Sequence, residues 1–346
     1  MKRYCKPMIE RSLILRLNST TYPPTPDELG LYAGSEFHAE QMEEVGSDVR
    51  LLAEARAVVV IAAKLRREAI CRLANCRVIA RFGTGVDNID VEAATERGII
   101  VTNYPDFCIS DMAEHTMALL LGMARKLLLM DSSMRTGAWD ARVRIPVHRV
   151  SGLRLGLIGY GRIAQAVAVR AAAFGLNIAF SDPCVAVDVS PVPATAVGLD
   201  ELLETSDFIS VHVPLTEGTR HMIGAAQFRK MKPSAVLINT ARGAIVDERA
   251  LVRALSEGWI AGAGLDVYEE LAVFSTPEAV PQHPLLTMRN VILTPHSGGC
   301  SVESLEDLMR EGARQLVGCL RGEKLRNVVN REVLSRLGFG TNILRV

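Results

Sequence analysis

Short apolar runs alternate along this chain with segments whose apolar residues recur every three or four positions. The early runs cover 13–15, 57–61, 77–80 and 98–102, and the later ones cover 153–158, 177–181, 208–213, 235–239, 261–266 and 290–293. Continuous apolar runs of this length are typical of strands that are buried on both faces of a parallel sheet. The helical segments between them provide the crossovers that parallel strands need. The pattern therefore predicts an α/β fold, in which a small parallel sheet precedes a larger, doubly wound one.

Residues 111–129 carry the longest helical pattern, and one side of it gathers Met112, His115, Thr116, Leu119, Leu120 and Met123. This apolar side is wider than one small domain needs, so we interpret the segment as an interdomain helix with a possible dimer surface. A wholly buried core helix is the alternative, and the sequence does not separate the two. A last helix is expected over 303–322, followed by an irregular tail.

A glycine-rich turn follows the strand at 153–158, in the run LGLIGYGRIA over residues 155–164. Gly159 permits the tight turn, Gly161 lets the backbone approach a phosphate, and Ala164 is small enough for the helix to pack on the strand. This is the arrangement that binds the pyrophosphate of a dinucleotide. The first N–H groups of the helix, from Arg162 and Ile163, are expected to face that anion.

The segment after this turn completes the unit that the fingerprint requires. Apolar residues recur with helical spacing up to Gly175, and the next strand, 177–181, ends at Asp182. A carboxylate at that position accepts both ribose hydroxyls of NAD and repels the 2′-phosphate of NADP, so we expect NAD. The alternative is a glycine turn in an unrelated α/β unit.

Composition excludes several other classes. The 346 residues are 49% hydrophobic and 23% charged, with a formal net charge of zero, which favours neither a nucleic acid nor a membrane surface as partner. No apolar run is long enough to span a bilayer, and no secretory signal is expected at the N-terminus. The seven cysteines form no C-x-x-C pair, so no metal site or disulfide framework is predicted, and a cytoplasmic protein is expected.

Three segments that follow predicted strands carry polar and cationic side chains: 211–216, 238–243 and 293–299. The carboxyl ends of parallel strands form the usual ligand-binding edge. Arg242 suits a substrate carboxylate and its ketone, because a guanidinium bridges two oxygens in one plane. His296 suits the proton donor, because imidazole titrates near neutral pH. A solvated turn arginine and a capped loop histidine are the alternatives.

A comparable glycine loop follows the early strand at 77–80, in residues 81–87. Its backbone N–H groups, around Thr84 and Gly85, are expected to form a nest for the anionic substrate.

These motifs lead to a family resemblance. The motifs are 83–90, 156–164, 211–216, 239–247 and 294–296. Over roughly residues 55–330 the chain resembles the D-isomer-specific 2-hydroxyacid dehydrogenases. The segments AATERGI at 93–99 and PHSGGCSVESL from Pro295 resemble the C-terminal-binding-protein-like branch, close to the phosphoglycerate dehydrogenases.

The resemblance implies roles for particular residues. Arg242 is implied as the catalytic, substrate-binding arginine and His296 as the acid/base. Asp266 is implied to accept a hydrogen bond from the nicotinamide carboxamide. The residues implied to flank the nicotinamide and its ribose are His212, Pro214, Thr216, Thr240 and Ala241.

The resemblance also implies a discontinuous domain organisation. Residues 1–103 and 297–346 are expected to form a smaller, flavodoxin-like substrate domain. Residues 104–296 are expected to form the NAD-binding Rossmann domain.

One position departs from the family pattern. The family places a glutamate that pairs with the histidine five residues after the aspartate, and this chain has Leu271 there. A shift of one residue would bring Glu270 to His296 and raise the pKa of the imidazole. The alternative is a site without a carboxylate partner for the histidine.

Three functions follow from these observations. The leading hypothesis is an NAD-dependent oxidoreductase that moves a hydride between nicotinamide and a small D-2-hydroxy or 2-oxo acid, in a homodimer. A corepressor-like protein that senses NAD(H) with little turnover is one alternative. A dehydrogenase of phosphite or a phosphonate is another.

Overall fold

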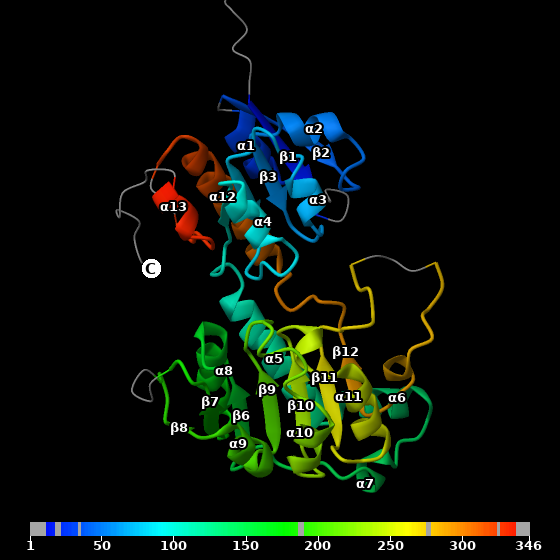
Figure 1. Ribbon diagram of the computed structural model, residues 1–346. Helices are drawn as coiled ribbons and strands as arrows, with labels where there is room; N and C mark the ends of the chain where they lie inside the picture. Colours follow the sequence, from blue (N-terminus) through cyan, green and yellow to red (C-terminus); the bar gives the residue numbers. More distant parts are fainter. Residues whose placement is uncertain are drawn as a thin grey trace, which may run out of the picture. The chain divides into compact units, whose positions relative to one another are not determined.

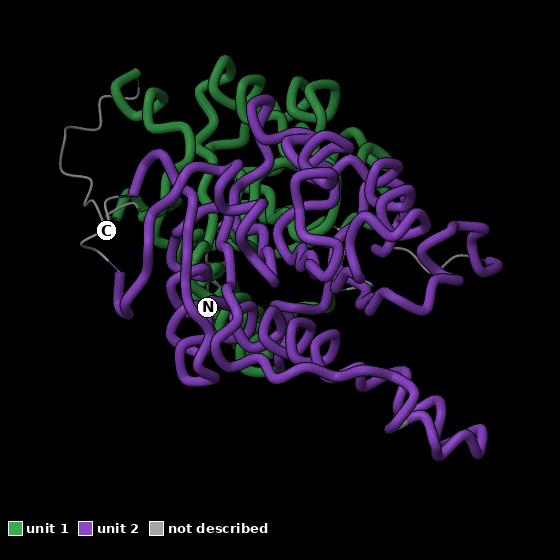
Figure 2. The backbone as a smooth tube through the Cα atoms, turned by 90° about the horizontal axis from the view of Figure 1, so that it is seen from below, with its two compact units in different colours: residues 1–107, 302–346 green, residues 108–301 purple. Residues whose placement is uncertain are grey.

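The computed structural model describes residues 12–17, 22–33, 36–185, 190–274, 278–323 and 326–336. The chain forms two compact units, residues 1–107 with 302–346 and residues 108–301 (Figure 2). The expected boundaries were 103/104 and 296/297. Both units are built on parallel sheets (Figure 1).

The first unit has a five-stranded sheet in the order β2-β1-β3-β4-β5, and all its strand pairs are parallel. This is the strand order of a flavodoxin-like fold, which the family resemblance implied, although strand β2 was not predicted. The strands are β1 Ser12–Leu17, β2 Phe37–Met42, β3 Ala57–Val60, β4 Val78–Arg81 and β5 Ile100–Thr102. The helices from the first part of the chain are α1 Pro26–Ala33, α2 Val49–Glu54, α3 Arg67–Ile70 and α4 Val91–Glu96.

The end of the chain completes this first unit. Helix α12, Val302–Leu320, packs against α1 and β4, and its Gly312 lies so close to Phe82 that an added Cβ would come within 2.8 Å of the ring. The expectation of an irregular tail was wrong for residues 332–336, which form helix α13. This short helix forms because Val333 and Leu334 are buried in the same core.

The second unit has a seven-stranded sheet in the order β12-β11-β10-β9-β6-β7-β8. Its strands are β6 Arg154–Ile158, β7 Asn177–Ser181, β8 Ala194–Ala196, β9 Phe208–Val211, β10 Val236–Asn239, β11 Gly262–Leu265 and β12 Val291–Leu293. This is the strand order of a Rossmann sheet. The chain first adds strands on one side of β6 and then, from β9 onward, adds them on the other side. The short edge strand β8 was not predicted, because its ATA sequence has no apolar run.

Helices cover both faces of this sheet (Figure 1). They are α5 Ile109–Ala124, α6 Leu127–Arg135, α7 Ala141–Arg144, α8 Arg162–Ala173, α9 Leu199–Thr205, α10 Ala225–Lys230 and α11 Glu248–Ser256, with short 3₁₀ turns at Gly243–Ile245 and Pro284–Leu286. No described helix has the length and apolar character needed to cross a bilayer.

The helix expected over 111–129 is two helices. Helix α5 ends at Ala124. Lys126 has a left-handed backbone (φ 54°), and α6 begins at the next residue. The apolar side of α5 packs against α8 and strands β10, β11 and β12. Gly264 in β11 permits this approach, since a Cβ there would lie 3.0 Å from Leu119. Helix α5 is thus packed on the sheet by its apolar side, but it is not wholly buried, because Ser110, Glu114 and Ala118 are exposed.

Candidate active site

The glycine turn between β6 and α8 has the shape that its sequence predicted. Gly159 has φ 85°, and a Cβ there would lie 3.0 Å from the backbone of both His212 and Val213. Gly161 precedes the first turn of α8, and an added Cβ would meet nothing within 4 Å. Ala164 is fully buried between helix and sheet. The turn therefore leaves the N-terminal end of α8 open, beside exposed Arg162 and half-buried Ile163.

Asp182 ties the end of β7 to this turn. Its Oδ2 accepts the N–H of Tyr160 at 2.8 Å, and its Oδ1 accepts the N–H of Cys184 at 2.8 Å. The ring of Tyr160 stacks on Phe180, with centroids 4.0 Å apart. The carboxylate is thus fixed next to the open helix end. An open helix N-terminus beside a fixed carboxylate fits the pyrophosphate and the ribose of NAD.

His212 follows β9 on the same edge of the sheet. Its N–H donates to Ile158 O at 2.7 Å, and its Nε2 lies 2.9 Å from the hydroxyl of Ser210. Burial lowers the pKa of His212 to about 4, so the ring is neutral at physiological pH. Pro214 and Thr216 are exposed in the loop that follows, which the hydroxyl of Thr219 closes by donating to Pro214 O at 2.6 Å.

Arg242 follows β10 in a turn with little freedom. The side chain of Asn239 holds this turn: Oδ1 accepts the N–H of Ala241 at 3.1 Å, and Nδ2 donates to Arg242 O at 2.9 Å. Gly243 packs directly on the backbone of Tyr268, where any Cβ would overlap. The guanidinium is half-buried and donates from Nη1 to Ala241 O at 2.7 Å.

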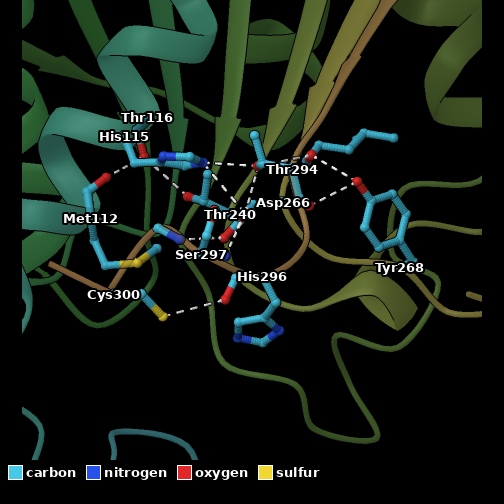
Figure 3. Close-up of polar contacts among 12 residues, drawn as sticks. Met112, His115, Thr116, Thr240, Asp266, Tyr268, Thr294, His296, Ser297 and Cys300 are labelled. Atoms are coloured by element: carbon cyan, nitrogen blue, oxygen red, sulfur yellow. Dashed lines mark hydrogen bonds and ion pairs between the residues drawn. The ribbon is translucent and has the colours of Figure 1, made fainter. Parts of the chain in front are cut away.

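Asp266, directly after β11, is the centre of the polar network at this edge (Figure 3). Its buried carboxylate accepts the hydroxyl of Thr294 at 2.6 Å and the N–H groups of Ser297 and Gly298 at 2.9 Å each. His115 Nε2 lies 3.4 Å away. Burial acts to raise the pKa of Asp266, but these donors outweigh it, so the pKa lies below its ordinary value. The carboxylate is therefore ionised and organises the loop at 294–298.

His115 and Thr294 were not predicted to belong to the site. His115 Nε2 lies 2.9 Å from Thr294 Oγ1, although the two residues are 179 positions apart. At the next residue of α5, Thr116, the hydroxyl lies 3.0 Å from that of Thr240. Local sequence placed His115 and Thr116 on an apolar helix side. Their partners, Thr294 and Thr240, lie just after strands β12 and β10. Tertiary packing brings these residues together, and no short sequence motif predicts it.

His296 lies in the loop after β12, with a left-handed backbone at φ 56°. Its N–H donates to Asp266 O at 2.9 Å, and the N–H of Asp266 donates to Asn239 O at 3.0 Å. These two backbone hydrogen bonds thus connect the chain segments at the carboxyl ends of β10, β11 and β12. His296 makes one of them, and Arg242 lies three residues after Asn239, which accepts the other. In Figure 3 the imidazole points away from the Asp266 network.

Glu270, the predicted partner of His296, contacts two other side chains, those of Arg249 and His283. Its Oε1 is 3.0 Å from Arg249 Nε, and its Oε2 is 3.8 Å from His283 Nε2. A pairing with His296 would require these contacts to be exchanged, and it stays a prediction.

The same region gathers three potential metal ligands, since ligand atoms of Glu248, Glu270 and His283 lie within 4.8 Å of one another. Nδ1 of His283 accepts the N–H of Leu285 at 3.3 Å, so a neutral ring carries its proton on Nε2. That nitrogen lies 3.0 Å from Glu248 Oε1. A metal would need the lone pair of Nε2, so we interpret the cluster as a hydrogen-bonded brace.

In the first unit, the loop after β4 carries the residues that were predicted to form a nest for an anion. Gly83 has φ 139°, and its carbonyl accepts the N–H of Tyr104 at 3.0 Å. The side chain of Asn103 donates to Thr84 O at 2.7 Å. Thr84 is exposed and Gly85 half-buried, so their N–H groups lie in an accessible loop.

A Rossmann sheet with this turn, and with arginine, aspartate and histidine at its carboxyl edge, defines a nicotinamide-dependent dehydrogenase. A family model described as "D-isomer specific 2-hydroxyacid dehydrogenase, NAD binding domain" matches residues 117–298. The chain belongs to the D-isomer-specific 2-hydroxyacid dehydrogenase family, as its motifs predicted. It is an NAD(H)-dependent oxidoreductase that acts on CH–OH donors.

Individual relatives agree with this assignment. The chain is 40% identical to a glyoxylate reductase of Thermococcus litoralis, over 80% of this chain and 84% of that protein. It is 45% identical to a D-3-phosphoglycerate dehydrogenase of Methanocaldococcus jannaschii, over 79% of this chain and 51% of that protein. The structure of a D-lactate dehydrogenase from Aquifex aeolicus, complexed with NAD and lactic acid, superposes with a TM-score of 0.81 at 30% identity, covering 90% of this chain and 96% of that one.

Proposed function

We propose that Arg242 and His296 carry the reduction of a small 2-oxo acid, and that glyoxylate belongs to the substrates. The observation that supports this proposal is the pair of backbone hydrogen bonds Asn239–Asp266–His296, which ties the segments that carry Arg242 and His296 to one sheet edge. Relatives named glyoxylate reductase support the choice of substrate.

Each residue has a defined task in this proposal. Bound NADH supplies the hydride. Arg242 binds the substrate carboxylate and polarises the ketone, because its planar guanidinium donates to two oxygens at once. His296, protonated, donates its proton to the oxygen that becomes the alcohol. The N–H groups around Thr84 and Gly85, in the first unit, are proposed as a nest for an anionic group of the substrate.

The residues that would hold the cofactor surround the open end of α8. The N–H groups at Gly161, Arg162 and Ile163, after the turn at Gly159, would bind the pyrophosphate. Asp182 would accept the ribose hydroxyls. Asp266 Oδ2 accepts one protein donor, Gly298 N–H, which leaves it an acceptor position for the carboxamide. The residues that would flank the nicotinamide are His212, Pro214, Thr216, Thr240 and Ala241.

Steady-state assays of NADH oxidation against a panel of 2-oxo acids test the proposal. Arg242→Ala and His296→Ala should each lower kcat/KM, the histidine change by about 10²–10⁴-fold. Arg253→Ala, which removes an exposed arginine that is paired with Glu257 at the end of α11, is the matched control and should leave turnover unchanged. Full activity in His296→Ala would refute its role.

The alternatives are open to the same assay. NADH binding without turnover of any acid would indicate a corepressor-like sensor, and phosphite-dependent reduction of NAD would indicate a phosphite dehydrogenase. Neither is favoured, because the relatives are named for 2-oxo and 2-hydroxy acids.

We also propose a cytoplasmic homodimer without a nucleic-acid or membrane partner. Its support is an exposed apolar surface on and around α6 and α7: Leu127, Leu128, Met134, Trp139 and Val143, which are 56–78% exposed. Exposed apolar groups that cluster in this way mark protein interfaces. The six described cysteines are free thiols, as in a reducing compartment. Light scattering of the wild type and Trp139→Glu tests the dimer, and a monomeric wild type would refute it.

A further inference from the structure

The loop after β9 contacts the turn that follows Arg242. The N–H of His221 donates to Ala244 O at 2.8 Å, and the N–H of Ile223 donates to Ile245 O at 3.2 Å. Both acceptors belong to the 3₁₀ turn that begins directly after Arg242. His221 has a left-handed backbone at φ 52°, which a residue other than glycine keeps only where its surroundings determine it. The position of His221 beside this turn is therefore specified by the fold.

The loop after β11 makes a second contact with the same turn. Gly243, the residue after Arg242, lies so close to the backbone of Tyr268 and Glu269 that an added Cβ would overlap both. The N–H of Glu269 donates to Glu248 Oε2 at 2.8 Å, which fixes the backbone at this point to the first turn of α11. The main chain of Glu269 is therefore held against Gly243.

The side chains of His221 and Glu269 connect these two loops. His221 Nε2 lies 2.8 Å from Glu269 Oε2 and 2.9 Å from Oε1, and Arg220 Nη1 lies 3.2 Å from Oε1. Each of the two paired residues also contacts, through its backbone, one of the two positions that follow Arg242. The contacts therefore form a closed ring, in which one part is the start of the 3₁₀ turn and another is the His221–Glu269 pair.

The His221–Glu269 pair is too exposed to be a main source of stability. Its side chains are 44% and 26% exposed, and ion pairs at such positions contribute little to the free energy of unfolding. The pair instead restrains the separation of two loops, and thereby the movement of the turn between them. A guanidinium that binds a carboxylate through two parallel hydrogen bonds depends on its orientation. Loosening of this turn should therefore affect substrate binding by Arg242 more than folding.

We propose that Glu269, through its pair with His221, is a positioning residue for Arg242. The proposal rests on the proposed role of Arg242 in binding the carboxylate and ketone of the substrate. Neither member of the pair touches the substrate in this assignment. Because a displacement of about 1 Å at a reacting centre costs up to ~10²-fold in rate, loss of the pair has a measurable kinetic effect.

Two single variants and their combination test the proposal in the full-length enzyme. Glu269→Ala removes the carboxylate, and His221→Asn removes the imidazole but keeps a residue type that tolerates a positive φ. We expect each to lower kcat/KM for glyoxylate about tenfold, with a KM for NADH within about twofold of the wild type. Because both changes remove the same contact, the double variant should lose about as much as either single variant.

Two further variants separate positioning from a structural role. Glu257→Ala is the matched control, because the Glu257 carboxylate is 45% exposed and also has two partners, Arg253 at 2.7 Å and the Nε1–H of Trp259 at 3.0 Å. It should keep the wild-type kcat/KM and melt at about the same temperature as Glu269→Ala. Glu269→Gln keeps an oxygen that accepts the N–H of His221, so it should recover most of the lost kcat/KM.

Three results would overturn the positioning role. They are an unchanged kcat/KM in Glu269→Ala, a KM for NADH that rises together with the KM for glyoxylate, and a double variant whose loss is the product of the two single losses.

The two proposals fail in distinguishable ways. If Arg242→Ala keeps full turnover, the substrate-binding role of Arg242 is refuted, and the positioning role is refuted with it. If Arg242→Ala is impaired while Glu269→Ala matches the wild type, only the positioning role is refuted.

Discussion

His115 Nε2 lies 2.9 Å from Thr294 Oγ1, and the same hydroxyl donates to Asp266 at 2.6 Å. The three side chains come from α5, from the loop after β12 and from the end of β11. Helix α5 thus supports, through one hydroxyl, the carboxylate that orders the loop of His296.

Replacement of this hydroxyl should therefore affect both stability and turnover. Thr294→Val keeps the shape but removes the hydroxyl that bonds both His115 and Asp266 Oδ1, so the carboxylate oxygen keeps the Ser297 N–H and loses its shortest bond. We expect a loss of about 1–3 kcal/mol in the free energy of unfolding, measured by urea denaturation, together with a lower kcat. Thr287→Val is the control, because the Thr287 hydroxyl is bonded to Pro284 O at an exposed position. Equal stabilities of the two variants would contradict the expectation.

Two glycine variants should separate folding from cofactor binding. Gly159→Ala introduces a Cβ at φ 85° against the backbone of His212, so it should cost about 1–3 kcal/mol of stability and weaken NADH binding. Gly161→Ala adds a Cβ in open space, so the melting temperature should hold while NADH binding falls. Calorimetry and fluorescence titration with NADH measure the two effects. NADH binding that is unchanged in Gly161→Ala would show that the pyrophosphate does not lie there.

His212 should make stability dependent on pH. In the folded protein burial lowers its pKa to about 4, whereas an unfolded histidine titrates near its ordinary value of 6.5. Between these values the unfolded state binds more protons, so stability should fall as pH drops from 6.5 to 4. His212→Gln should flatten this part of the curve, and the exposed His148→Gln should not. Identical curves for wild type and His212→Gln would contradict this.

The first unit contains a buried ion pair. Arg16 Nε lies 2.9 Å from Glu28 Oε1, both side chains are at most 1% exposed, and the hydroxyl of Tyr32 donates to the same oxygen at 3.1 Å. Arg16→Met leaves the carboxylate buried without its cation, so it should cost about 3–5 kcal/mol of unfolding free energy in urea. The double variant with Glu28→Leu should recover part of this loss. A single variant as stable as the wild type would contradict the argument.

Local motifs were enough to predict two parallel sheets with all their strands except β2 and β8, and the glycine turn, and to single out Asp182, Arg242 and His296 as candidates. These features depend on residues close in sequence, or on the rule that parallel strands end at one edge. Only the family resemblance identified Asp266 as a candidate site residue, because an aspartate in the sequence GLDVY has no chemical feature that marks it as one.

Other features depend on contacts between distant residues, which the sequence does not record. His115 contacts Thr294 and Arg16 contacts Glu28 only in the folded chain, and the same is true of the rings of Phe274 and His296, whose centroids are 4.8 Å apart. Strand β8 and helix α13 are too short and too weakly patterned to predict, and their formation depends on the neighbours against which they pack.

Helix α12 is the last long element of the chain, yet its Leu316 and Met309 lie in the core of the first unit with Phe82. The side chain of Asn330 also accepts the N–H of Val101 beside β5. On the ribosome, the Rossmann unit is therefore complete in sequence before the unit that begins the chain. The first sheet can bury its apolar surface against α12 only after residues 302–336 have been synthesised, so the core of the unit that begins the chain depends on a segment made after the Rossmann unit.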